Sequence, residues 1–448
     1  MDRVNFGVRP SLSAILRLHS PSASGLDADG GVAFHPAMKL LLPLLLLAGA
    51  ARAGDWPQFH GPHRDNLSTE TNLLARWPDG GPQLLWRAAH LGEGFASAAI
   101  SAGKIFTTGN IGSNTIITAL DLTGKQLWQA TNGPACHRPH PGARSTPTIV
   151  GEKLYHLNAE GDIVCLDTTT GRALWSLNML KQFGGRSIQW GLSEALLVDG
   201  DRVCATSGGS NVLMVALDRH TGKTIWQTPG TGDKPGYTAP QLITVDGQRQ
   251  IVTMASGSAI GVAPDTGKLL WRFAMPAPYE VNASHPVYHD GQLALFGTWG
   301  RGAYLLRLKP DGDRCAVEQV WHTTELDNEH GSVVLVNGTL FGHADGNHKQ
   351  RHWAALDWAT GRTLWTSEAF PGPRSGALTT AAGMLYLLNE KRQVALVHAD
   401  PTKLDIVSQF ELPAEGTGPS WAHPVICNGR LYVRYSQFLY AFDIAARQ

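Results

Sequence analysis

Aromatic, cationic and amide side chains recur in short segments that each come directly before an apolar, strand-like run. These side chains are Arg144, Trp190, Tyr237, Asn282, His285, His330, Arg374, Trp421 and His423. Aromatic rings can stack on a flat ligand, and Arg or His can donate hydrogen bonds to an anionic one. If the fold gathers these residues around one mouth, they could bind a planar or anionic ligand. The same side chains could instead fill a channel as a hydrogen-bonded plug.

Two His-rich strings contain the residue types that bind metals. CHRPHPG offers Cys136, His137 and His140, and GHADGNHKQRHW offers His343, Asp345, His348 and His352. Neither string has the spacing of a familiar metal site, and both are expected in loops, so we predict no metal site. The sequence also contains no Gly-rich phosphate loop, no G-x-S-x-G and no H-E-x-x-H, so hydrolase chemistry has no support.

The composition excludes one large class of partner. Lys plus Arg and Asp plus Glu number 37 each, which gives a net charge of zero, and only 17% of the residues are charged. Nucleic-acid binding needs a basic excess, so we expect no nucleic-acid partner. Of the five cysteines, Cys165, Cys204 and Cys427 lie in apolar, strand-like runs, whereas Cys136 and Cys315 are expected in loops.

The first part of the chain is predicted to direct export. Residues 38–53, MKLLLPLLLLAGAARA, have one Lys, an apolar run and an Ala-x-Ala ending at Ala53, which is typical of a signal peptide. The apolar run is too short for a transmembrane helix. Residues 1–37 are interpreted as an upstream, disordered extension. We therefore expect a soluble periplasmic or secreted protein, cleaved near Ala53 and, with no Cys after that site, without a lipid anchor.

A string of a dozen residues occurs five times and organises the rest of the chain. It reads VALDRHTGKTIW at 215–226, with close copies ending at Trp128, Trp175, Trp271 and Trp365. The pattern predicts a hairpin in which Asp218 folds onto the backbone N–H groups ahead of it and Gly222 supplies a positive φ. Repeated at fixed intervals, a Trp such as Trp226 would be buried between neighbouring sheets.

The spacing of the repeat predicts the architecture. The strands end at Trp86, Trp128, Trp175, Trp226, Trp271, Trp321, Trp365 and Phe410, at intervals averaging about 46 residues, which suits four strands per blade. Eight further hairpins precede them, and the last copy, FLYAFDI, ends without its Trp strand. The strand around Trp86 therefore completes the last blade. We predict an all-β, eight-bladed β-propeller over residues 84–446, preceded by an N-terminal arm at 54–83.

The motif A-x-D-x-x-T-G-[KR]-x-x-W resembles the tryptophan-docking repeat of the pyrroloquinoline quinone (PQQ) type propellers, the quinoprotein alcohol dehydrogenase-like superfamily. The resemblance covers the chain from Asp55 to Ile444. It implies that PQQ with Ca²⁺ is a possible cofactor. Many dehydrogenases of this superfamily stack the quinone on a disulfide of adjacent cysteines and cover it with long insertions. This chain has no Cys-Cys pair and is too short for such insertions.

Three functions remain open. We expect a monomeric, exported propeller that binds a small molecule or an envelope protein at its mouth, without catalysis and without a certain cofactor. The first alternative is a PQQ-dependent dehydrogenase that oxidises an alcohol or a sugar. The second is a scaffold subunit of an envelope assembly complex.

Overall fold

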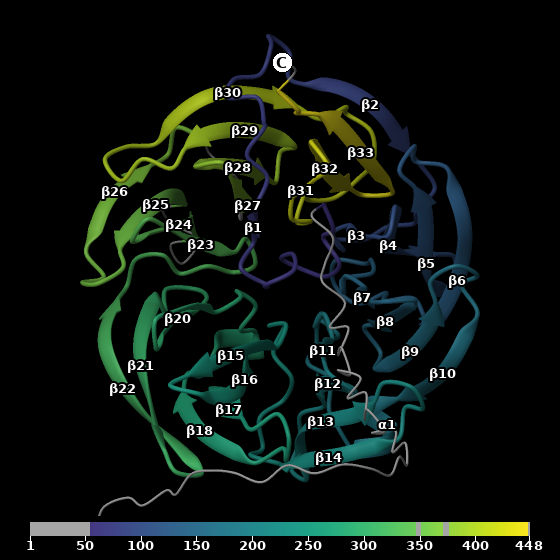
Figure 1. Ribbon diagram of the computed structural model, residues 1–448, viewed down its shortest axis with the longest axis vertical. Helices are drawn as coiled ribbons and strands as arrows, with labels where there is room; N and C mark the ends of the chain where they lie inside the picture. The colour runs from purple at the N-terminus through teal and green to yellow at the C-terminus, as the bar shows by residue number, and fades with distance from the viewer. Residues whose placement is uncertain (1–53, 346–350, 371–375, 447–448) are drawn as a thin grey trace, which may run out of the picture. The chain divides into compact units, whose positions relative to one another are not determined.

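The computed structural model of the protein describes residues 54–345, 351–370 and 376–446. In this part of the chain, eight sheets of four antiparallel strands follow one another around a ring, and one sheet carries a fifth, parallel strand (Figure 1). The predicted eight-bladed β-propeller is therefore confirmed. The expected extension at residues 1–37 and the signal peptide at 38–53 lie outside the described residues.

Blades are numbered in chain order, and each begins with its inner strand. Blade 1 contains β3 (Ala99–Ser101), β4 (Lys104–Ile111), β5 (Asn114–Asp121) and β6 (Gln126–Pro134). Blade 2 contains β7 (Thr148–Val150), β8 (Lys153–Leu157), β9 (Asp162–Asp167) and β10 (Ala173–Asn178). Blade 3 contains β11 (Leu197–Asp199), β12 (Arg202–Thr206), β13 (Val212–Asp218) and β14 (Thr224–Pro229). Blade 4 contains β15 (Gln241–Val245), β16 (Gln248–Met254), β17 (Ser258–Val262) and β18 (Leu269–Ala274).

The second half of the ring repeats this order. Blade 5 contains β19 (Val287–His289), β20 (Gln292–Phe296), β21 (Ala303–Asp311) and β22 (Arg314–Thr323). Blade 6 contains β23 (Val333–Val336), β24 (Thr339–Ala344), β25 (His352–Asp357) and β26 (Thr363–Ser367). Blade 7 contains β27 (Gly376–Ala381), β28 (Met384–Asn389), β29 (Gln393–His398) and β30 (Asp405–Glu411), with β1 (Leu67–Ser68) added beside β27. Blade 8 contains β31 (Val425–Cys427), β32 (Arg430–Tyr435), β33 (Phe438–Asp443) and β2 (Gln83–Ala88).

Helical structure in the described residues is short and lies in loops that connect neighbouring blades. The α-helix α1 (Met179–Phe183) follows blade 2, and the 3-10 turn η1 (Pro278–Glu280) follows blade 4. Neither is long and apolar enough to cross a membrane.

The repeated motif joins each blade to the next. Trp175, on the outer strand of blade 2, donates its Nε1–H to the backbone O of Arg219 in blade 3 at 3.0 Å. The indole ring packs against Gly222 of the same turn, where an added Cβ would lie 2.8 Å from ring atom Cε3. Gly222 also has a φ of 72°, which glycine adopts without strain. The Trp and the Gly of the motif therefore form one contact between neighbouring copies.

The same hydrogen bond recurs around most of the ring. It joins Trp86 to Leu122 (2.9 Å), Trp128 to Thr168 (3.1 Å), Trp226 to Pro264 (2.9 Å), Trp321 to Trp358 (2.9 Å) and Trp365 to Asp400 (2.9 Å). Within the turn, the carboxylate of Asp218 accepts hydrogen bonds from the backbone N–H groups of His220 at 3.0 Å and Thr221 at 2.8 Å, as predicted. A bond from the Thr221 hydroxyl also lowers the pKa of Asp218.

Two positions depart from the pattern. Trp271 donates to Oε1 of Gln250 in its own blade at 2.6 Å, because the β21–β22 hairpin of blade 5 turns at Asp311 without the Thr-Gly sequence. In blade 7, Phe410 takes the place of the Trp and packs against Gly81, just before β2. An apolar ring thus covers a glycine even where the motif has degenerated.

The N-terminal strand closes the ring as predicted. Strand β2 pairs antiparallel with β33, and Trp86 lies opposite Ala441. Figure 1 shows β2, in purple-blue, beside the yellow strands of the chain's end. Since Trp86 also docks on blade 1, this one strand joins the last blade to the first.

Several residues expected in loops lie on strands instead. Cys315 is buried on β22, because the outer hairpin of blade 5 is longer than in the repeat. His343 lies on β24 and His352 on β25. All five cysteines are buried free thiols.

A pair of Gly→Ala substitutions separates the docking contact from backbone strain. Gly222 and Gly200 both have positive φ, 72° and 55°, but only the added Cβ of Gly222 would meet the Trp175 ring; at Gly200 nothing lies within 4 Å. We expect Gly200→Ala to cost about 1–2 kcal/mol of unfolding free energy from strain alone. Gly222→Ala should cost about 1–3 kcal/mol more because the ring must move. Denaturant unfolding measures both values, and equal losses would contradict the docking account.

Candidate functional site

A cavity of about 700 Å³ lies at the mouth where the chain enters the inner strands. Six of the nine predicted residues line it, namely Arg144, Trp190, Tyr237, His330, Trp421 and His423. They come from the segments that precede blades 2, 3, 4, 6 and 8. The fold thus gathers side chains that are far apart in the sequence around one space of the size of a small-molecule site.

Two of the other three predicted residues, Asn282 and His285, do not line the cavity. Asn282 is buried and donates its amide hydrogens to the backbone O of Ala255 at 2.8 Å and of Met275 at 3.1 Å, so it ties two loops together. His285 is buried, and its ring meets that of His60 edge to face at 5.0 Å. Arg374 lies outside the described residues.

Sequence reasoning missed several lining residues, including Phe59, Phe95, His140, Tyr279, Trp299, Glu329 and Arg351. Tyr279 and Trp299 come from loops around blade 5 that lie outside the repeated pattern, so their spacing gave no signal. Their φ values are 54° and 50°, and that of His140 is 57°. Left-handed backbone at aromatic residues is strained, and such strain clusters at functional sites.

Aromatic rings form two groups on the cavity wall. The Trp421 ring lies 4.9 Å from Phe95, 4.9 Å from His140 and 4.6 Å from His330, between ring centroids. Tyr279 and Trp299 form the second group, with centroids 5.1 Å apart and an interplanar angle of 80°. Because these rings line the cavity, the wall can pack against a ring-containing ligand.

The N-terminal arm runs through the centre of the ring, where Figure 1 shows the purple segment leading to β1. Trp56 forms a β-bridge with Ile100 of blade 1, and Pro57 accepts from Ile149 of blade 2 at 2.8 Å. Further along, the arm forms β1, parallel to β27 of blade 7. No repeated pattern in the sequence indicates this path.

His60 anchors the arm just below the cavity. Its Nε2 lies 2.7 Å from the Ser332 hydroxyl and 3.0 Å from Nδ1 of His423. The Nε2 of His423 donates to the backbone O of His330 at 2.8 Å, so its Nδ1 is left as an acceptor for the His60–Ser332 pair. Phe59 stacks on His60 with centroids 3.8 Å apart and lines the cavity. The arm therefore supplies the floor of the cavity.

Arg64 fixes the next turn of the arm against blade 3. It donates from Nη2 to the backbone O of Leu196 at 2.5 Å and from Nη1 to that of Ala195 at 3.2 Å, and it is almost fully buried. Burial lowers its pKa to about 10. Burial raises the pKa of nearby Glu194 to about 7, although the charge of Arg64 acts in the opposite direction. The hydrogen bonds of Arg64 to the two backbone carbonyls tie the arm to the wall that carries Ala195.

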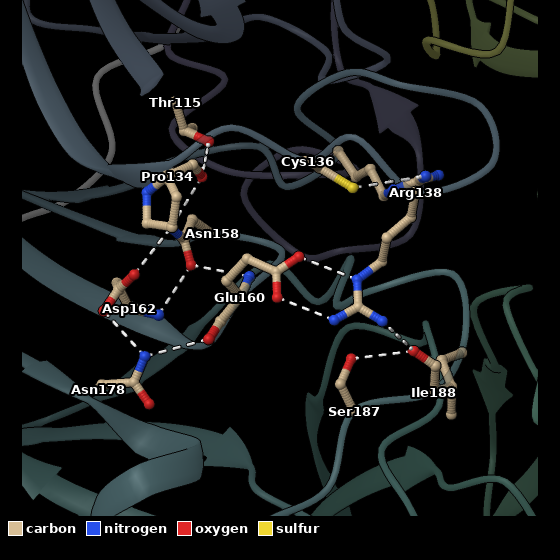
Figure 2. A network of polar contacts seen from close by, with 11 residues as sticks. Thr115, Pro134, Cys136, Arg138, Asn158, Glu160, Asp162, Asn178, Ser187 and Ile188 are labelled. Atoms are coloured by element: carbon tan, nitrogen blue, oxygen red, sulfur yellow. Dashed lines mark hydrogen bonds and ion pairs between the residues drawn. The ribbon is translucent and has the colours of Figure 1, made fainter. Parts of the chain in front are cut away.

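A polar network braces the two loops that carry His140 and Trp190 (Figure 2). Arg138 makes a bidentate ion pair with Glu160, with both N–O distances 2.9 Å, and donates to the backbone O of Ile188 at 3.1 Å. Asn158 holds the Glu160 turn by accepting from its backbone N–H at 3.0 Å. Because Ile188 lies two residues before Trp190, this pair fixes the position of the indole ring.

Burial controls the charge of the mouth. It lowers the pKa of His285 and His330 to about 3 and that of His423 to about 4. These rings are therefore neutral at pH 7. Burial also raises the pKa of the Tyr237 hydroxyl, which stays a hydrogen-bond donor. The charged groups that line the cavity in the described structure are Arg144, Arg351 and Glu329.

The donor set does not fit a calcium-bound quinone. Calcium takes six to eight oxygen ligands, mostly from carboxylates, carbonyls and amides. Among the described residues, Glu329 is the one carboxylate that lines the cavity and Gln189 the one side-chain amide. No group of three or more His, Cys, Asp or Glu side chains in this part of the chain is placed to hold a metal ion. The described residues of the two His-rich strings form no such group of metal ligands. His348 lies outside the described residues.

The fold, the docking contacts and the cavity at the mouth define a propeller of the PQQ type. Residues 112–367 match the family described as outer membrane protein assembly factor BamB. This match covers more than half of the chain, and the chain belongs to that family.

Known relatives fall into two groups. The chain is 22% identical over 262 residues to the outer membrane protein assembly factor BamB of Shewanella oneidensis, covering 56% of this chain and 63% of the relative. It is 31% identical over 130 residues to the 1-butanol dehydrogenase (quinone) of Thauera butanivorans, covering 26% of this chain and 20% of the relative. Both matches span less than two thirds of the relative's length.

Solved structures agree on the fold. The quinohemoprotein alcohol dehydrogenase of Comamonas testosteroni superposes with a TM-score of 0.63 at 14% identity, covering 90% of this chain and 82% of that one. At this identity the likeness concerns the architecture alone.

The buried histidines predict an acid-sensitive fold. An unfolded His gains a proton below about pH 6.5, whereas His285, His330 and His423 stay neutral in the fold until about pH 3–4. Unfolding therefore takes up protons between these values, and stability falls as the pH is lowered through this window. Replacing His285 by Gln should reduce the loss between pH 7 and pH 5 by about 2 kcal/mol.

Denaturant unfolding at the two pH values measures this loss. His137→Gln, at an exposed position, is the matched control for the effect of the substitution itself. An unchanged pH dependence in His285→Gln would contradict the assignment of a neutral, buried ring.

Proposed function

We propose that this chain is an exported binding propeller of the cell envelope, that its ligand occupies the cavity at the mouth, and that it acts without catalysis. One observation carries the proposal: an aromatic cavity of about 700 Å³ has a floor made by the chain's own N-terminal arm. A surface that only filled a channel would not leave such a space between aromatic walls. Rings that keep their faces toward a cavity suit reversible binding.

Export is part of the same proposal. It rests on the signal-peptide pattern of residues 38–53, with cleavage near Ala53. The family match, to an outer membrane protein assembly factor, supports a place in the envelope. An envelope protein that inserts a segment into the mouth is an alternative ligand to a small molecule, and an assembly-scaffold role would use the same cavity.

A PQQ-dependent dehydrogenase is the second candidate. Relatives named as quinone dehydrogenases favour it, as does the placement of the aromatic cavity at the mouth. The donor set around Glu329 and Gln189 weighs against it, because it offers too few oxygen ligands for Ca²⁺.

A fragment screen tests the site. Saturation-transfer NMR on the wild type with a set of soluble indoles, naphthols and phenyl compounds should find binders. Trp190→Ala combined with Trp421→Ala should weaken those binders at least about tenfold, since each ring contributes a stacking face. Because both rings lie at the cavity and not in the blade cores, the melting temperature should change little.

The controls use exposed apolar residues on the rim. Leu127→Ala with Leu174→Ala, on the outer strands of blades 1 and 2, should leave fragment binding unchanged. Binding that persists in the Trp double variant would place the site elsewhere. Dye-linked oxidation of alcohols or sugars by the wild type with PQQ and Ca²⁺, lost in the Trp double variant, would show that the dehydrogenase function is correct.

A further inference from the structure

Several buried polar atoms at the mouth have no hydrogen-bond partner within the described structure. They are Nε of Arg144, Nε1 of Trp190, the hydroxyl of Tyr237 and both ring nitrogens of His330. Buried polar groups are normally paired, and an unpaired one costs about 1–3 kcal/mol. All four side chains line one cavity, and a ligand whose polar atoms reach the unpaired atoms after small side-chain adjustments would relieve that cost.

The unpaired atoms are mainly donors. Arg144 offers an N–H, Trp190 an indole N–H, and Tyr237 an O–H that burial keeps protonated by raising its pKa. His330, whose pKa burial lowers to about 3, is a neutral ring with one donor and one acceptor nitrogen. The cavity therefore favours a ligand that presents acceptor oxygens.

Arg144 is held in place and pairs with no carboxylate in the described part of the chain. Its Nη2 donates to the backbone O of Pro139 at 3.0 Å and of His140 at 2.8 Å, which fixes the plane of the guanidinium. Its Cζ lies 5.8 Å from the centroid of the Phe95 ring. A fixed guanidinium with an unused N–H is a preferred partner for a carboxylate.

The charged side chains that line the cavity among the described residues favour a ligand that carries a negative charge. Glu329 and Arg351 both line the cavity and carry opposite charges. His330 and His423 are neutral at pH 7 because burial lowers their pKa values. Among the described lining residues, Arg144 is then the guanidinium in excess of Glu329 and Arg351, which suits a carboxylate better than a phosphate dianion placed near Glu329.

On the basis of the proposed function, we infer that the mouth contains a carboxylate subsite formed by Arg144 and Tyr237, and that the ligand is a ring-bearing carboxylic acid. The carboxylate accepts hydrogen bonds from the Arg144 Nε–H and the Tyr237 hydroxyl. The ring of the ligand packs against Trp190 and Trp421. Aromatic acids and uronic acid sugars share this chemistry, because both join a carboxylate to a ring with a face that can stack on indole.

Matched pairs of probes separate the carboxylate from the ring. The aromatic pair is indole-3-acetate with indole-3-acetamide, and the sugar pair is a galacturonate trisaccharide with its methyl ester. In calorimetry at pH 7 with the full mature chain, we expect the acid of at least one pair to bind about tenfold or more tightly than its neutral partner. The pair that shows this preference identifies the source of the carboxylate.

Substitutions assign the preference to residues. Arg144→Gln should bring the acid and its neutral partner to within about twofold, and Tyr237→Phe should reduce the preference. Trp190→Ala should weaken both members of the pair and keep their ratio, since it removes the stacking face. Arg144→Lys keeps the positive charge but loses the planar guanidinium, so it should retain part of the preference for the acid. Because this variant also loses the contacts to the loop, it shows whether their loss alone explains the lost preference of Arg144→Gln. Exposed Arg172→Gln, in the docking turn of blade 2, should change nothing.

Two results would overturn the inference. One is equal binding of acid and neutral partner by the wild type, or binding of neither pair; the other is a preference that survives in Arg144→Gln. In either case, fragment binding that depends on Trp190 and Trp421 would leave the mouth as the binding site. Loss of that dependence as well would overturn the proposed function.

Discussion

The contact between the indole ring of one blade and the glycine turn of the next is the constraint on which the molecule depends. Trp175 covers Gly222 and donates to the same turn, and six of the eight seams use this hydrogen bond. Each blade needs the next blade to bury its Trp. Only in a closed ring does every blade have a neighbour on both sides. Closure in turn requires the N-terminal strand β2 to reach the last blade, and this places the arm that precedes it in the central channel.

Closure explains why the cavity has its present form. The arm enters beside blade 1, contacts His423 and Ser332 through His60, and then pairs with blade 7. It therefore occupies the channel and leaves the mouth as a pocket with Phe59 in its floor. The buried charge of Arg64 is tolerated because backbone carbonyls of blade 3 accept its hydrogen bonds.

The periodic features of the fold could be predicted from the sequence, and the features without a repeated counterpart could not. Blade number, closure at Trp86 and the Asp218 turn follow from spacing, because each repeat encodes its own hairpin and its contact with the next. Six residues of the mouth could be predicted for the same reason, because each lies in a segment that precedes an inner strand. The path of the arm depends on contacts between residues hundreds of positions apart, such as that of His60 with His423, which no local pattern records. Tyr279 and Trp299 lie in loops without a repeated counterpart.

Site-specific photo-crosslinking in cells tests most directly whether the mouth is the binding site. A photoreactive residue would replace Gln189, which lines the cavity, or Leu127, which is 45% exposed on the outer strand of blade 1. The account predicts a cross-linked adduct at position 189 that disappears when Trp421 is also replaced by Ala, and none at position 127. An adduct at position 127 alone would place the binding surface on the rim of the propeller and contradict the account.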